Sequence, residues 1–329
     1  MTNFLGFTLI IFTYISVICI ILLSLGMFDL YDRRGLFATL LIVVIFNWAP
    51  FYDGVLQGFP AEFIEILGIV FGFYLFLKGK PISAGIVLGF VSTIKVLPVI
   101  FLFYFAYKKQ FKLVMAAIIT GLILSAVILW RENLNPELLN SIITSIGRNA
   151  AYGHDTRDAG LNAFIHFVFH RSFGADVLIK IHYAACLFLA LFFMAIELRI
   201  NTKKNRYLFG LAAVSLAMFH VSPHTTEMYW YILLLPAIIF NIWMLMIYRD
   251  KIFGVTFIFS YVFMHGFSLL SIFFRIFRLV SHFFNDHIAY ADMYLNFNKH
   301  GGIFIGVWLL YFSTYGLALK YLVRNKRVE

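Results

Sequence analysis

The sequence predicts an all-α protein, a polytopic transmembrane helical bundle with two long external loops. Of its 329 residues, 62% are hydrophobic and only 13% are charged, a balance that soluble domains of this length do not show. Apolar runs recur along the chain, and since roughly 20 apolar residues cross a bilayer as a helix, they amount to about 8–10 membrane segments. We expect residues 1–329 to form a single integral-membrane domain.

The apolar runs set the order of the predicted spans, which cover 4–27, 36–50, 61–77, 113–130, 177–200, 207–221, 229–248, 252–272 and 303–322. The polar stretches 131–174 and 273–302 form the two long loops. Short basic turns lie at 33–34, 78–80, 108–112, 199–206 and 249–251. Because Lys and Arg favour the cytoplasmic side, these turns and the basic tail are expected there. The protein is thus predicted to be a multi-pass protein of the plasma (inner) membrane, with its long loops external.

This orientation depends on the segment between the basic turns at 78–80 and 108–112, which must enter and leave the membrane on one side. Its halves, 82–94 and 97–107, are each about 15–20 Å long as helices, at 1.5 Å per residue. Pro98 lacks an N–H group and clashes with the preceding turn, so it breaks the helix between them. We predict a broken hairpin at 82–107. The alternative, one continuous kinked span, would leave one basic cluster outside.

Lys95 lies in the middle of this segment, three residues before Pro98. A charged side chain at membrane depth is costly unless it faces protein or a water-filled cavity. Lys95 is therefore the first candidate binding residue. In the alternative interpretation its side chain extends along the helix to the interface.

The external loops contain most of the other candidates. Between residues 148 and 158, carboxylates, His and Arg alternate: Arg148, His154, Asp155, Arg157 and Asp158. A base that deprotonates an acceptor hydroxyl must be a carboxylate or His within hydrogen-bond reach. A phosphate leaving group is stabilised by Arg or Lys. A solvated polar loop would have a similar composition, so both interpretations stand.

A second polar site is the turn at 222–228. Pro223 suits the first turn of a helix, with Ser222 as its cap. His224 and Glu227 are three residues apart and share one face if helical. They form either a metal or acid/base pair, or a cap that meets lipid head groups.

Other features exclude several functions. The chain has no Gly-rich nucleotide loop, Walker motif or Rossmann fingerprint. The net charge of +10 resides in short turns between spans, so it reflects topology and not nucleic-acid binding. His282, Asp286 and His287 have spacings compatible with metal ligands, but no further ligand has a fixed spacing. We predict no cofactor, no metal ion and no nucleic-acid partner.

Several motifs occur in an order found in a known family. Ala84-Gly85 to Gly89 is a small-residue helix after a basic turn, and Lys95 to Pro98 forms K-x-x-P. Gln57-Gly58, the segment 160–171, and Ser222-Pro223 before a helix ending in Leu-Leu-Pro at 234–236 add further matches. Together they resemble the integral-membrane GT-C glycosyltransferases. The sequence looks most like glycosyltransferase family 87, the polyprenyl-phosphate-mannose-dependent mannosyltransferases.

The resemblance implies inverting transfer of mannose or another hexose on the external face, without metal dependence. The implied partners are a polyprenyl-phosphate-sugar donor, a lipid or glycan acceptor, and membrane lipid. The substrate-binding candidates are Lys95, Arg148, Arg157, His154, Asn162, Arg171, Ser222 and Gln57. The catalytic candidates are Asp155, Asp158, Glu227 and His224.

Two departures from the family pattern leave alternatives open. The family's catalytic Asp lies on a first external loop, and no residue here matches it. The chain is then a complete enzyme whose base is another residue such as Asp155, Asp158 or Glu227, an N-terminally truncated enzyme, or a relative without transferase activity. The family tends to carry a His shortly after its S-P pair. Here Thr226, Glu227 and Met228 occupy that area, so the role of this His is open or passes to His224. A transporter or translocase would also use broken helices and a midplane Lys, although such proteins usually show inverted repeats. A third alternative is a purely structural membrane subunit, but this alternative does not explain why polar residues cluster in the long loops.

Overall fold

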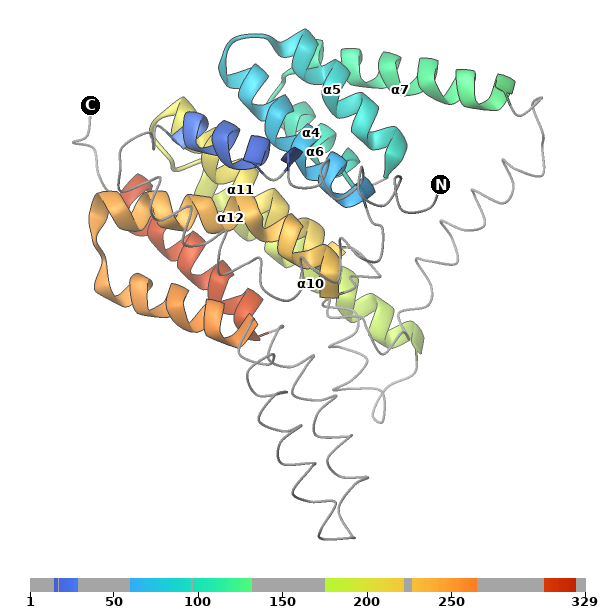
Figure 1. The fold of residues 1–329 in the computed structure, drawn as a ribbon. Coiled ribbons are helices and arrows are strands. Elements are labelled where there is room, and N and C mark those ends of the chain that lie inside the picture. The colour runs from blue at the N-terminus through green and yellow to red at the C-terminus, as the bar shows by residue number, and fades with distance from the viewer. Residues whose placement is uncertain are drawn as a thin grey trace, which may run out of the picture.

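The computed structural model describes residues 15–16, 18–28, 60–95, 97–131, 175–221, 227–264 and 305–323. Within these ranges all regular secondary structure is helical, which confirms the predicted all-α class (Figure 1). Two described helices contain windows long and apolar enough to cross a membrane, Phe111–Ile128 and Lys180–Glu197. The predicted span at 36–50 and both long polar loops lie outside the described residues.

The helices fall close to the predicted spans. Their bounds are α4 (Pro60–Leu77), α5 (Pro81–Ile94), α6 (Val99–Tyr107), α7 (Phe111–Arg131), α10 (Ala175–Glu197), α11 (Lys203–Val221) and α12 (Glu227–Tyr248). Further helical stretches cover Ile18–Phe28, Lys251–Met264 and 305–317, and the last continues into the π-helical turn η1 (Ala318–Val323).

One helix runs through a proline. The apolar pattern predicts a span over 229–248, whereas the family resemblance ends a helix at Pro236; α12 continues through this proline to Tyr248, as the predicted span requires. A proline removes one backbone hydrogen bond, and in a membrane helix neighbouring helices compensate for this loss. Pro236 is buried, in agreement with such support.

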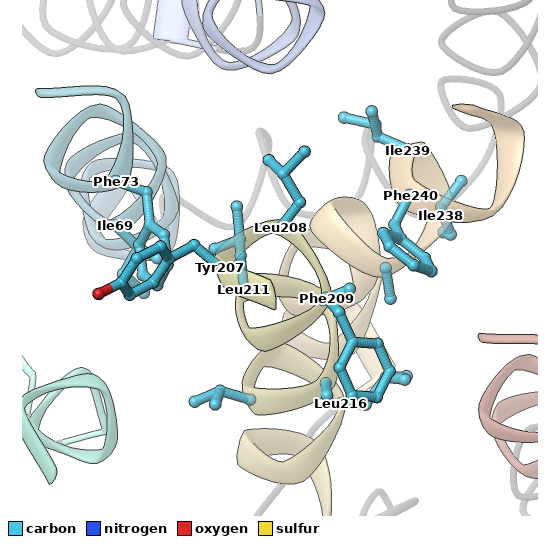
Figure 2. Packing of buried hydrophobic residues seen from close by; sticks show 14 of the residues in the cluster. Ile69, Phe73, Tyr207, Leu208, Phe209, Leu211, Leu216, Ile238, Ile239 and Phe240 are labelled. Carbon is cyan, nitrogen blue, oxygen red and sulfur yellow. The ribbon is translucent and has the colours of Figure 1, made fainter. Parts of the chain in front are cut away.

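The core of the molecule is built around α11. Every residue from Tyr207 to Leu216 is buried, because helices pack against α11 on all sides. Figure 2 shows α11 between α4 and α12, with Phe73 of α4 on one side and Phe240 of α12 on the other. A helix that is apolar all round belongs in the interior of a bundle. The lipid-facing role falls instead to helices such as α7, most of whose large apolar side chains are exposed.

The turns after α4 and α6 are built alike. After α4, the N–H of Lys80 donates to Leu75 O and that of Gly79 to Phe76 O, and Gly79 has a positive φ of 77°. After α6, Gln110 and Lys109 repeat the same pair of bonds, and Lys109 has φ 55°. Both are Schellman caps, in which a left-handed residue ends the helix. The residue that ends the helix is Gly79 in the first turn and the basic Lys109 in the second.

These basic turns gather at one end of the bundle. Lys108, after α6, forms an ion pair with Glu197 at the end of α10. Gln110, before α7, donates a hydrogen bond to the Tyr207 hydroxyl near the start of α11, with 3.1 Å between the two atoms. Lys78 and Lys203 line one cavity. This clustering agrees with the predicted arrangement; that this end faces the cytoplasm stays a prediction.

Candidate functional site

The site is organised by the interruption between α5 and α6. Pro81 opens α5 at its first turn, and the helix ends after 14 residues at Ile94. Lys95 leaves the helix with φ −140° and ψ 145°, although its N–H still donates to Val91 O at 3.0 Å. The extended conformation follows from Pro98, which cannot continue a helix from the preceding turn. Pro98 is instead the N-cap of α6.

The two helices form the predicted hairpin. A Cβ atom placed on Gly85 would overlap the Leu113 carbonyl, and one on Gly89 would overlap the Ala117 carbonyl. Thr93 approaches Gly121 in the same register, so α5 and α7 run parallel, side by side (Figure 1). Because α5 and α7 both start at the basic end, α6 must return there. A continuous span is therefore excluded.

The glycines of α5 explain how a broken segment is held in place. Small residues let membrane helices approach at backbone distance, where van der Waals contact is greatest. Gly85 and Gly89 provide this contact with α7, while Ala84 and Leu88 on the adjacent face pack against α4. The interrupted backbone at Lys95 thus lies at the end of a three-helix layer, in agreement with the rule that broken backbone at membrane depth must be covered by protein.

The length of α5 sets the depth of Lys95. At 1.5 Å per residue, its 14 residues place Lys95 about 21 Å from the basic turn. This length is about two thirds of the roughly 30 Å thickness of the hydrocarbon core of a bilayer. The Lys95 side chain is half-buried. An ammonium group at this position can meet an anionic group from a lipid.

Glu65 is a further candidate that the sequence analysis did not single out. A Cβ on Gly72 would contact Leu88, and one on Gly68 would overlap Val91, which fixes an antiparallel register between α4 and α5. One turn further along each helix, this register brings Glu65 level with Lys95. The Glu65 side chain is fully buried, with 0% of its surface exposed.

A periodic signal in the sequence marks Glu65. Glu65, Gly68 and Gly72 occupy one helical face, and a carboxylate on a small-residue face is expected to turn toward the neighbouring helix. The sequence alone does not show how α4 is aligned against α5. The structure shows this alignment, and it places the buried Glu65 carboxylate at the same height along the helices as Lys95.

Most other predicted site residues lie outside the described residues. This group comprises Gln57, Arg148, His154, Asp155, Arg157, Asp158, Asn162, Arg171, Ser222 and His224, together with the weak candidate at 282–287. Glu227 is the first residue of α12, and its side chain is not described. Among the described residues, no group of three or more His, Cys, Asp or Glu side chains is placed to hold a metal ion.

An apolar cavity of about 270 Å³ lies beside α6, between this helix, α10 and α11. Its α6 wall begins at Ile100, a few residues after Lys95, and includes Phe103 and Tyr107. Phe193 of α10 and Ala213 of α11 close the opposite side. The cavity offers hydrocarbon contact along the helix that follows the candidate cation.

Comparison with known proteins agrees with the sequence motifs. Neither a curated protein nor a solved structure gives a significant match. The model of glycosyltransferase family 87 matches residues 3–223, more than half of the chain, and this range includes Glu65, Lys95 and the whole α4–α7 layer. The chain belongs to glycosyltransferase family 87.

Proposed function

We propose that the protein is a GT-C-type transferase that moves a hexose, mannose first among the candidates, from a polyprenyl-phosphate-linked donor to a lipid-linked or glycan hydroxyl. Family membership establishes a membrane-associated glycosyltransferase, which has a sugar donor and an acceptor, and it disfavours the transporter alternative. The identity of the donor and the acceptor is our proposal. The observation that carries it is the position of Lys95 at the break of the hairpin.

The reaction needs a cation where the phosphate departs. The acceptor oxygen bonds to the anomeric carbon as the bond from that carbon to the phosphate oxygen breaks, and the acceptor proton passes to a base. One displacement inverts the anomeric centre. The polyprenyl phosphate leaves with increased negative charge, and a unit charge about 4 Å away stabilises it by about 4 kcal/mol at an effective dielectric constant of 20.

Two features favour a lipid-linked donor over a soluble one. Lys95 lies about 21 Å along α5 from the basic turn, at a depth where a soluble nucleotide sugar would have to leave water. The apolar cavity along α6 offers hydrocarbon contact close to the same point. An isoprenoid chain and a phosphate together match this combination of surfaces.

The catalytic base is proposed to come from the external polar segments. Asp155, Asp158, His224 and Glu227 are the candidates, because each can accept the proton of a hydroxyl group. Arg148, His154, Arg157, Asn162, Arg171, Ser222 and Gln57 are proposed to bind the phosphate and the sugars. The reaction then takes place on the external face of the plasma membrane.

The test is transfer by the purified chain in lipid nanodiscs, with radiolabelled polyprenyl-phosphate-mannose, polyprenyl-phosphate-glucose or a nucleotide sugar as donor. A membrane lipid extract supplies the acceptor. Lys95→Ala is expected to lower the rate at least about a hundredfold, the usual cost of a lost electrostatic stabiliser. Lys95→Arg should retain part of the activity.

Lys112→Ala is the matched control, because this exposed lysine lies beyond the other end of the hairpin and should leave the rate unchanged. Thermal unfolding of each variant separates loss of activity from loss of folding. A fully active, folded Lys95→Ala variant would remove the proposed role of Lys95. A product formed from the nucleotide sugar alone would overturn the proposed donor.

A further inference from the structure

A basic cavity lies where the turn between α4 and α5 meets the start of α11. Its volume is about 650 Å³. Lys78 lines it from the turn, and Lys203 and Lys204 line it from the first residues of α11. Among the described residues that line this cavity, none is acidic. The fold thus concentrates three ammonium groups from two distant segments around one space.

The Tyr207 hydroxyl adds a hydrogen-bond donor to the lysines. Gln110 also lines the cavity, and its amide donates to the Lys108 carbonyl and to the Tyr207 hydroxyl, with 3.3 and 3.1 Å between the atoms, which leaves the hydroxyl hydrogen of Tyr207 for a ligand. Pro81, the first residue of α5, also lines it, and no side chain caps this helix. The N–H groups of an uncapped first turn carry partial positive charge and favour an anion. This second feature points to the same ligand chemistry as the lysines.

One wall of the cavity is apolar. Met27, Phe76 and Leu77 contribute to it, and Leu77 is the last residue of α4. The cavity therefore lies at the ends of the spans, next to the level where lipid head groups meet hydrocarbon. A free anion would use the charged groups alone, whereas a phospholipid would contact both kinds of wall.

We propose that this cavity binds the head group of an anionic phospholipid, with its phosphodiester among the lysines and its first acyl carbons along the apolar wall. Basic pockets between membrane helices are suited to such head groups. The volume lies within the range of small-molecule sites, about 300–1,000 Å³. The bound lipid bridges the α4–α5 turn and α11. The proposal is independent of sugar transfer.

The test is native mass spectrometry of the full chain in detergent, titrated with phosphatidylglycerol and, for comparison, neutral phosphatidylcholine. The wild-type chain is expected to bind phosphatidylglycerol more tightly. Each lysine near the surface is worth about 1 kcal/mol toward an anionic lipid. The triple variant Lys78→Ala/Lys203→Ala/Lys204→Ala should therefore weaken binding about a hundredfold, at about 1.4 kcal/mol per tenfold.

A charge-matched control is Lys112→Ala/Arg199→Ala/Lys251→Ala, which removes three exposed cations that do not line the cavity. It should bind phosphatidylglycerol like the wild type. An equal loss in both variants would assign binding to general surface charge and overturn the proposal. Displacement by millimolar inorganic phosphate would identify a free-anion site and overturn the lipid as occupant.

A second measurement covers the case in which the triple variant fails to fold. Photoactivatable phosphatidylglycerol is added to the wild-type chain, and the cross-linked peptides are sequenced. Cross-links are expected in peptides that contain residues 74–81 and 203–207. Cross-links confined to other segments would overturn the proposal.

Discussion

The ammonium group of Lys108 lies 2.5 Å from Glu197 Oε1 and ties the end of α6 to the end of α10. Glu197 is completely buried, and the Tyr104 hydroxyl donates to the same oxygen at 3.0 Å. An ion pair in this setting stabilises little compared with apolar side chains, but removal of one partner leaves a buried charge.

From this pair we predict a strongly non-additive mutant cycle. Lys108→Met and Glu197→Leu alone should each lower the free energy of unfolding by about 3 kcal/mol, because each strands the other charge. The double variant should recover most of the loss. Reversible unfolding in detergent measures all four chains. Additive effects in the cycle would show that the two side chains are not coupled.

Close packing between α5 and α7 gives a second prediction. Gly89→Ala should destabilise the protein by about 1–3 kcal/mol, since its methyl group would overlap the Ala117 carbonyl and backbone cannot move aside cheaply. Gly121→Ala is the control on the same interface, because the nearest atom to its new methyl group, on Thr93, is 3.9 Å away. Thermal unfolding compares the two. Equal stability would contradict the close approach.

Glu65 is predicted to position Lys95. Glu65→Gln keeps the size of the side chain but removes its charge, and we expect at least a tenfold higher KM for the donor with the acceptor KM unchanged. Transfer kinetics with each substrate varied in turn measure this split, which a general packing defect would not produce. In the Lys95→Ala background the same change should have no further effect. Independent effects of the two substitutions would disprove the coupling.

Asp250 provides a prediction on pH. Burial raises the pKa of its carboxyl, but hydrogen bonds from Lys320, Tyr321 and the Phe253 N–H outweigh burial and hold the pKa at about 2. A carboxyl with a depressed pKa stabilises the fold above its unfolded value near 3.8, and this stabilisation is lost as the pH falls toward 2. The excess stability of the wild type over Asp250→Asn should therefore be constant above about pH 5 and shrink below pH 4. Thermal scans from pH 2 to pH 7 follow it. A difference that does not change with pH would contradict this assignment.

The same carboxylate caps the helix that begins at Lys251. Asp250 Oδ1 accepts hydrogen bonds from the N–H groups of Ile252 and Phe253, at 3.0 and 3.2 Å. Asp250→Ala should cost more than about 1 kcal/mol at neutral pH, the usual value of an N-cap, because it also removes the hydrogen bonds from Lys320 and Tyr321. Hydrogen exchange of the first turn reports the loss directly.

The arrangement of the basic turns predicts which sites share a side of the membrane. In a chain with Cys19 and Cys186 replaced by Ala, single Lys80→Cys and Arg199→Cys variants should react with an impermeant maleimide in inverted vesicles only. Asn149→Cys, on the predicted external loop, should react in intact cells. Labelling of Lys80→Cys and Arg199→Cys from opposite sides would contradict the shared end of the bundle.

Local features made the hairpin predictable. The hairpin depends on Pro98, on the lysines at both ends and on the short helical halves. All of these lie within some thirty residues of one another, so the hairpin can be predicted from the sequence alone. Glu65 depends on a register between two helices, and that register arises from side-chain packing at Gly68 and Gly72. The apolar run also predicted the span that passes through Pro236, and only the family resemblance placed a helix end there. The candidate base residues lie outside the described residues, so their roles stay predictions.

The short, interrupted hairpin also constrains how the protein is made. Neither α5, with 14 residues, nor α6, with nine, is long enough to cross the hydrocarbon core as a finished span. The open backbone between them is stable only under protein cover, which α4 supplies first and α7 completes. The hairpin is therefore expected to become stable in the bilayer only once α7 has joined α4 and α5, so that the four helices α4 to α7 assemble as one unit.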